Sequence, residues 1–133
     1  MIKTHLTSKE YEVMKVLWNS DSPLLISDIL SLTKTVSENS IHHMINSLLK
    51  KGFVEVVGNV KVVKTPSRLY KPAITVAEYA ALQSNEIFKT TNSRFDFKNF
   101  LLCLAKQNKN KNNDIITELE DFIEDYKNQN INK

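Results

Sequence analysis

Glycine is scarce in this sequence, with two among 133 residues, whereas average usage would give about nine. Phosphate-binding loops and dinucleotide-binding fingerprints need clustered glycines, but Gly52 and Gly58 stand apart. A fold with many tight β-turns is also disfavoured, because such turns depend on glycine and Asn-Gly pairs. We therefore expect a mostly helical protein without a nucleotide-binding loop and without a cofactor.

Cysteine and long apolar runs are scarce as well. The single cysteine, Cys103, excludes an internal disulfide framework and a cysteine-rich metal site. No stretch approaches the roughly 20 apolar residues of a membrane-spanning helix, and the first residues lack the apolar core of a signal peptide. We expect a soluble, cytoplasmic protein that does not insert into a membrane.

Charge is unevenly spread, although the net value is only +3. Residues 1–72 hold ten Lys and Arg against six Asp and Glu, a balance of +4, whereas residues 73–133 carry −1. A basic first half favours a polyanionic partner, although an excess of this size is equally compatible with chance.

Three helices are predicted in the first fifty residues. The capping-box sequence Thr7-Ser-Lys-Glu10 predicts a helix over 8–18. Ser27 is expected to cap a second helix after a short extended run. Ser37 is expected to cap a third helix that ends at Gly52.

Residues 53–72 change to a β pattern rich in valine. Turns are expected at Gly58-Asn59 and at 65–67, and Pro72 ends the last strand. Three helices followed by such a hairpin is the order of a winged helix-turn-helix. Basic side chains on the hairpin would then neutralise DNA phosphates: Lys61, Lys64, Arg68 and Lys71.

Three more helices are predicted to start near Thr75, Asp96 and Asp114. The predicted fold class is mostly α with a small β-hairpin wing. Its two domains are a winged helix-turn-helix DNA-binding domain at 1–73 and a helical dimerisation domain at 74–133. The second domain has too little chain to cover its own apolar side chains, so we expect a homodimer. The alternative is that these side chains pack against the winged domain of the same chain. The side chains concerned are Tyr79, Leu82, Phe97, Phe100, Leu101, Leu104, Leu119, Phe122, Ile123 and Tyr126.

The third helix has a polar face of an unusual kind. With about 100° between residues, Ile41, Met44, Ile45 and Leu48 share the buried face. Amide, hydroxyl, imidazole and amine groups can contact base edges, whereas an ordinary solvated face mixes Glu and Lys. We therefore expect DNA contacts from the opposite face and its flanks: Asn39, Ser40, His42, His43, Asn46, Ser47 and Lys50.

Metal binding and catalysis find little support. His42 and His43 are adjacent on a helix, so their side chains diverge by about 100° and cannot chelate one ion together. Cys103 lies in the apolar run FLLCLA, where a buried, inert thiol is expected. No constellation of a base, a nucleophile and metal ligands is present, so we expect no enzyme and no metal site.

Several stretches resemble the penicillinase and methicillin-resistance repressors and their copper-transport relatives (BlaI/MecI/CopY). The specific matches are LTSKEYEVMKVLW, ISDIL, VSENSIHHMINSLLKKGFVE and RLYKPAIT, and FKNFLLCLAK matches more loosely. The resemblance implies a homodimeric transcriptional repressor that binds a dyad-symmetric, double-stranded DNA operator, usually near antibiotic-resistance (β-lactam) or copper-handling genes. It places base contacts at six of the third-helix residues named above, all except Lys50.

This chain departs from the family pattern at three points. Family members commonly have Thr at the positions of Ser40 and His43, and Arg at that of Ser47. The copper-responsive members carry a C-terminal cysteine cluster that is missing here. The β-lactam-responsive repressors are inactivated by a regulatory protease at an Asn-Phe bond, and the aligned pair here is Cys103-Leu104. These two residues do not themselves imply cleavage.

The sequence thus favours a sequence-specific repressor. The alternative is a winged-helix protein-interaction module without sequence-specific DNA binding, and the salt dependence of DNA binding separates the two.

Overall fold

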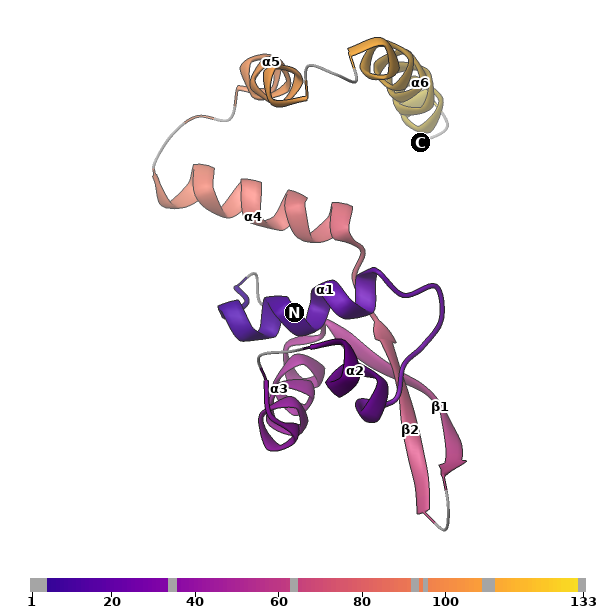
Figure 1. Ribbon diagram of the computed structural model, residues 1–133. Coiled ribbons are helices and arrows are strands. Elements are labelled where there is room, and N and C mark those ends of the chain that lie inside the picture. Colours follow the sequence, from indigo (N-terminus) through magenta and orange to yellow (C-terminus); the bar gives the residue numbers. More distant parts are fainter. Residues whose placement is uncertain are drawn as a thin grey trace. The chain divides into compact units, whose positions relative to one another are not determined.

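The computed structural model describes residues 5–33, 36–62, 65–91, 94, 96–108 and 112–131. Over these residues the element order is α1(Ser8–Trp18), α2(Ile26–Leu32), α3(Glu38–Lys51), β1(Val54–Val62), β2(Thr65–Pro72), α4(Val76–Thr90), α5(Phe97–Gln107) and α6(Asn112–Ile131). The chain forms two compact units, Met1–Ser93 and Arg94–Lys133. In the first unit the two strands extend away from the helices (Figure 1). The fold is a winged helix-turn-helix followed by further helices, which confirms the predicted fold class.

Side-chain caps fix three helix starts of the first unit where the sequence predicts them. Thr7 and Glu10 form a complete capping box at α1, Ser37 accepts from the Ser40 N–H at α3, and Thr75 forms a second box at α4. Gly52 ends α3 with φ 86°, a left-handed conformation that a side chain would strain.

The second helix begins earlier than predicted. Its N-cap is Leu25, whose N–H donates to the Asp28 carboxylate at 3.0 Å, so the prediction of Ser27 as the cap is wrong. The acid three residues after the cap supplies the missing bond, and Ser27 instead accepts from the Ser31 hydroxyl at 2.8 Å through its carbonyl.

The two strands of the hairpin are longer than predicted, because they include residues that were expected to form turns. Gly58 pairs with Leu69 and Asn59 with Arg68, so the turn expected at Gly58-Asn59 is wrong, and residues 65–67 also lie in a strand. The register shifts between Val56 and Gly58, as at a β-bulge, and glycine often marks such a point. The connection at 63–64 lies outside the described residues.

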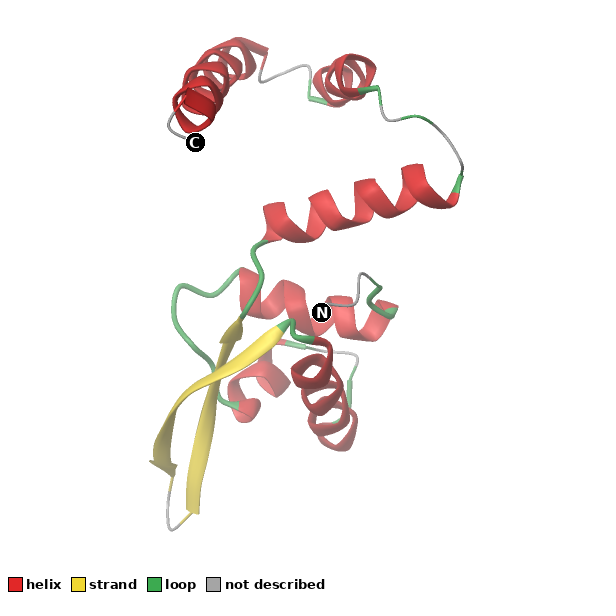
Figure 2. Ribbon diagram, turned by 180° about the vertical axis from the view of Figure 1, so that it is seen from behind, coloured by secondary structure: helices red, strands yellow, loops and turns green. Residues whose placement is uncertain are grey.

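The hydrophobic core lies in the first unit. Val13 and Leu17 of α1, Ile29 of α2 and Leu48 of α3 are 2% exposed or less. Each contributes about 1.5–3 kcal/mol by leaving water. Leu24 adds an isolated bridge to β2, with N–H···O distances to Tyr70 of 2.9 and 2.8 Å. The first three helices and the wing therefore share one core. Figure 2 shows these elements from behind.

The first turns of α4 pack against this core. Tyr79 stacks on Tyr11, and its ring centroid lies 5.6 Å from that of Trp18 and 5.8 Å from that of Phe53. Burial raises the pKa of Tyr79. Leu82 also packs against the core. Tyr79 and Leu82 therefore pack against the winged domain of the same chain, as in the alternative to dimerisation given above. The predicted domain boundary between residues 73 and 74 stays a prediction.

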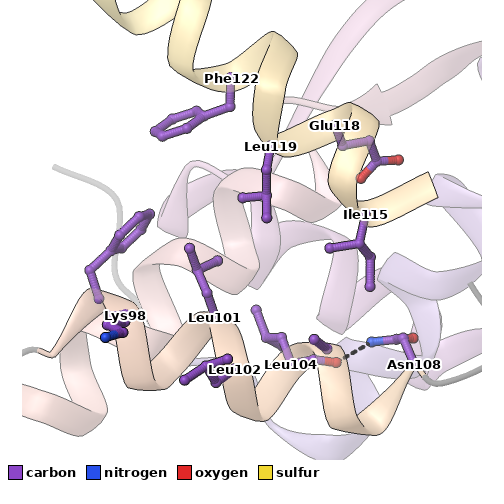
Figure 3. A pocket seen from close by; sticks show the side chains of 11 residues that line it. Lys98, Leu101, Leu102, Leu104, Asn108, Ile115, Glu118, Leu119 and Phe122 are labelled. Carbon is purple, nitrogen blue, oxygen red and sulfur yellow. Dashed lines mark hydrogen bonds between the residues drawn. The ribbon is translucent and has the colours of Figure 1, made fainter. Parts of the chain in front are cut away.

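The second unit is an open helix pair. Leu101 of α5 faces Leu119 of α6 across an apolar groove of about 950 Å³ (Figure 3). None of the side chains described in this unit is buried. Cys103 is exposed, so the prediction of a buried thiol is wrong. An apolar run winds all round a helix, and one neighbouring helix covers only one face of it.

A candidate DNA interface

The polar face of α3 is open to solvent as predicted from its spacing. Five of the predicted side chains are exposed along this helix: Asn39, His42, His43, Asn46 and Lys50. Asn39, His43, Asn46 and Lys50 follow one another at steps of four, three and four residues, which place them on one face of a helix, and His42 flanks that face. The single acidic residue of α3 is Glu38 in its first turn, where a negative charge stabilises the helix by interacting with the positive end of its dipole.

The predicted hydroxyls do not share this exposure. Ser40 is half-buried, and its Oγ lies 3.0 Å from the Ser37 Oγ, which donates to it. Ser47 is turned toward α1, where its hydroxyl donates to Glu10 Oε2 at 2.7 Å. In the free protein the Ser47 hydroxyl is therefore bonded within the fold.

Glu10 is a buried carboxylate that joins α1 to α3. Its side chain is 4% exposed, and Lys51 Nζ lies 2.6 Å from its Oε1. The same Oε1 accepts from the Thr7 N–H at 2.9 Å. Burial raises the pKa of Glu10, but the bonds from Lys51, Thr7 and Ser47 and the lysine charge outweigh it and lower that pKa from 4.5 to about 2. Glu10 is therefore held as a carboxylate.

The start of α3 and the wing line one cleft. His42 of α3 and Arg68 of β2 both border a cleft of about 500 Å³, together with Glu38, whose Oε1 lies 4.0 Å from His42 Nε2. Arg68 is exposed. The structure thus brings the predicted base-contacting helix and one predicted phosphate contact to the same edge of the fold.

The other basic wing residues have different placements. Lys71 is paired with Glu55 across the strands at 3.1 Å, so part of its charge is offset. The backbone of Lys61 pairs with Pro66, and Lys64 lies outside the described residues.

Five of the eight predicted dimerisation residues beyond α4 line the α5–α6 groove. Lining side chains from the predicted set are Phe97, Leu101, Leu104, Leu119 and Phe122. Phe122 contacts both Phe97 and Tyr126, with ring centroids 6.2 and 5.7 Å apart. Phe100 is half-buried and Ile123 is exposed. The pair aligned with the family's cleavage bond, Cys103 and Leu104, lies inside α5.

Sequence reasoning identified Glu10 only as a helix cap and missed its link to α3. The contacts to Ser47 and Lys51 span 37 and 41 residues. The capping box was the one local signal, and nothing in the spacing indicates that the carboxylate turns toward α3. Over the described residues, no group of three or more His, Cys, Asp or Glu could hold a metal ion.

The penicillinase repressor family model matches residues 6–125, which is nearly the whole chain. The chain belongs to the penicillinase repressor family. Repressors of this family act in transcription regulation by binding DNA, so the winged domain described above is that of a DNA-binding repressor. The match spans both units, so the helices after the wing belong to the family pattern as well.

Among curated proteins, none matches the chain. A solved structure, the ferric uptake regulator Fur of Helicobacter pylori, is 20% identical with a TM-score of 0.42, covering 69% of this chain and 73% of Fur. No helix in the described part of the repressor is long and apolar enough to cross a bilayer.

Proposed function

We propose that the protein represses transcription as a homodimer that binds a dyad-symmetric operator, with α3 in the major groove. The exposed amide, imidazole and amine row of α3 carries this proposal. Asn side chains can bond both edge atoms of adenine, and His and Lys can donate to acceptors on guanine. At 14 residues, α3 is about 21 Å long, enough to cross the groove.

The wing supplies contacts that do not depend on sequence. Arg68 borders the same cleft as His42, so it is placed to contact a phosphate beside the groove that α3 enters. Each neutralised phosphate releases counterions, which makes affinity fall as salt rises.

A second copy is the proposed occupant of the apolar groove of the second unit. Residues 94–133 form two helices around that groove and bury no described side chain. A unit this small cannot form a core of its own, and a two-fold partner with the same face covers both copies. The pair would then present two copies of α3 to half-sites about one helical turn apart.

The test is selection of DNA from a pool of random duplexes of about 30 base pairs, or three helical turns. The full chain should enrich one motif with dyad symmetry, its halves centred about 10 base pairs apart. Enrichment of no motif contradicts the proposal. Enrichment of an asymmetric motif retains DNA recognition but contradicts the two-fold arrangement.

A further inference from the structure

Two rows of side chains on α3 lie next to each other. The exposed row includes Asn46 and Lys50, whereas Ser47 and Lys51 make up a neighbouring row that is bonded to α1. Successive residues of a helix are rotated by about 100°. The rotation of α3 about its own axis therefore decides which row faces solvent.

Glu10 holds two successive turns of α3. Its Oε2 accepts from Ser47 at 2.7 Å and its Oε1 accepts from Lys51 at 2.6 Å, and the two partners are four residues apart. Lys51 Nζ also donates to the His5 carbonyl at 3.4 Å. The carboxylate itself is fixed by the Thr7 N–H at 2.9 Å. An anchor of this kind restrains both rotation and sliding of the helix.

The other contacts of α3 are of a different nature. Ile41, Ile45 and Leu48 are buried in the core. Apolar burial is non-directional, so it holds the helix against its neighbours but tolerates small rotations. Hydrogen bonds require defined distances and angles. The Glu10 contacts are therefore the most directional side-chain restraint on the C-terminal half of α3 among the described residues.

We propose that Glu10, acting through Ser47 and Lys51, is a positioning residue that sets the rotation of α3 and thereby its alignment with DNA bases. The proposal rests on the proposed function. Ser47 then contributes to sequence recognition through Glu10 instead of contacting a base. A loosened anchor displaces all base contacts together, whereas a lost base contact affects one base pair.

Five variants of the full chain test this: Glu10→Gln, Ser47→Ala, the double variant that combines these two changes, Ser47→Thr and the control Glu12→Gln. Glu12 also lies in α1 and pairs with a lysine, Lys15, at 2.7 Å, but both side chains are largely exposed. The measured quantity is the ratio of affinities for the duplex selected by the wild type and for a scrambled duplex. A series of duplexes, each with one base pair of the selected site changed, shows at which positions the preference is lost.

The expected result is a loss of discrimination spread over the half-site. Glu10→Gln and Ser47→Ala should each lower the ratio about tenfold, the equivalent of 1.4 kcal/mol. The double variant should lose little more, because both changes break one network. Ser47→Thr, which keeps the hydroxyl, should retain the ratio, as should Glu12→Gln. Affinity for scrambled DNA should change little in any variant, because Glu10 is buried and the Ser47 hydroxyl is bonded to it within the fold.

Other results would overturn the proposal. If Ser47→Ala changes preference at a single base pair while Glu10→Gln leaves the ratio intact, Ser47 contacts a base directly. Amide hydrogen exchange without DNA gives a second, independent measurement. Exchange at the end of α3 should accelerate in Glu10→Gln and Ser47→Ala but not in Glu12→Gln, and unchanged exchange would refute the anchor. A wild type without sequence preference refutes the proposed function, while exchange still decides whether Glu10 fixes α3.

Discussion

Lys51 Nζ lies 2.6 Å from Glu10 Oε1, although the two residues are 41 positions apart in the sequence and belong to different helices. This ion pair joins the first turn of α1 to the last turn of α3. Breaking one partner of a buried pair leaves an uncompensated charge and is costly. At low pH, protonation of the Glu10 carboxylate should break this ion pair.

Stability should therefore fall in acid. The pKa of Glu10 is lowered from 4.5 to about 2 in the folded protein, so the folded state favours the carboxylate. Its contribution is present above pH 4.5 and is lost as the pH falls from about 4.5 to about 2. The shift corresponds to a contribution on the order of 3 kcal/mol. Urea unfolding at about pH 7 and pH 3 measures the part of this contribution, about 2 kcal/mol, that is already lost at pH 3.

Glu10→Gln is the matched variant for the pH experiment. Because glutamine does not titrate, its stability should depend less on pH over this range than that of the wild type. Glu12→Gln, which removes an exposed carboxylate, should keep the wild-type dependence. Equal pH dependence in all three proteins would show that Glu10 is not the group responsible.

Much of the winged domain could be predicted from sequence because its signals are local. Thr7, Ser37 and Gly52 mark helix ends by chemistry within one turn, and the structure places them there. The predicted start of α2 was wrong because its N-cap, Leu25, has no side chain that can cap a helix. The capping hydrogen bond joins the Leu25 N–H to the Asp28 carboxylate instead. The link from Ser47 to Glu10 could not be predicted because it depends on tertiary packing.

The two glycines should respond to different extents when replaced by alanine. Gly52→Ala forces a side chain into φ 86° and should destabilise the protein by about 1–2 kcal/mol. An added Cβ at Gly58 would lie 3.9 Å from Leu69 Cδ1, an ordinary contact. Gly58→Ala should therefore change stability by less than about 1 kcal/mol. Urea unfolding of both variants measures the difference, and equal losses would contradict the account.

Base and phosphate contacts should separate by mutation. His43→Ala and Asn46→Ala should each relax specificity at one base pair per half-site, at a cost of about 1–3 kcal/mol. Arg68→Ala should weaken binding to all sequences alike and reduce the salt slope by about one. Titrations with duplexes changed at single positions measure both effects. Uniform weakening by all three variants would show that α3 does not contact bases.

The full chain should be a dimer at micromolar concentration. Leu119 lines the apolar groove of the second unit, so Leu119→Glu would place a charge in the proposed interface and should shift the protein to monomer. Thr117→Glu adds the same charge to an exposed position of α6 and should leave the dimer intact. Sedimentation velocity measures the mass, and a monomeric wild type would contradict the proposed assembly.

The most direct test of repression through sequence-specific binding is the affinity of the full chain for its selected duplex and for a scrambled one, measured from about 50 to 200 mM salt. We expect a steep loss of affinity with salt on both duplexes, and at least about a thousandfold preference for the selected one. Affinity that is independent of salt and equal for the two duplexes would contradict the central claim. It would indicate a winged-helix module that binds protein instead of DNA.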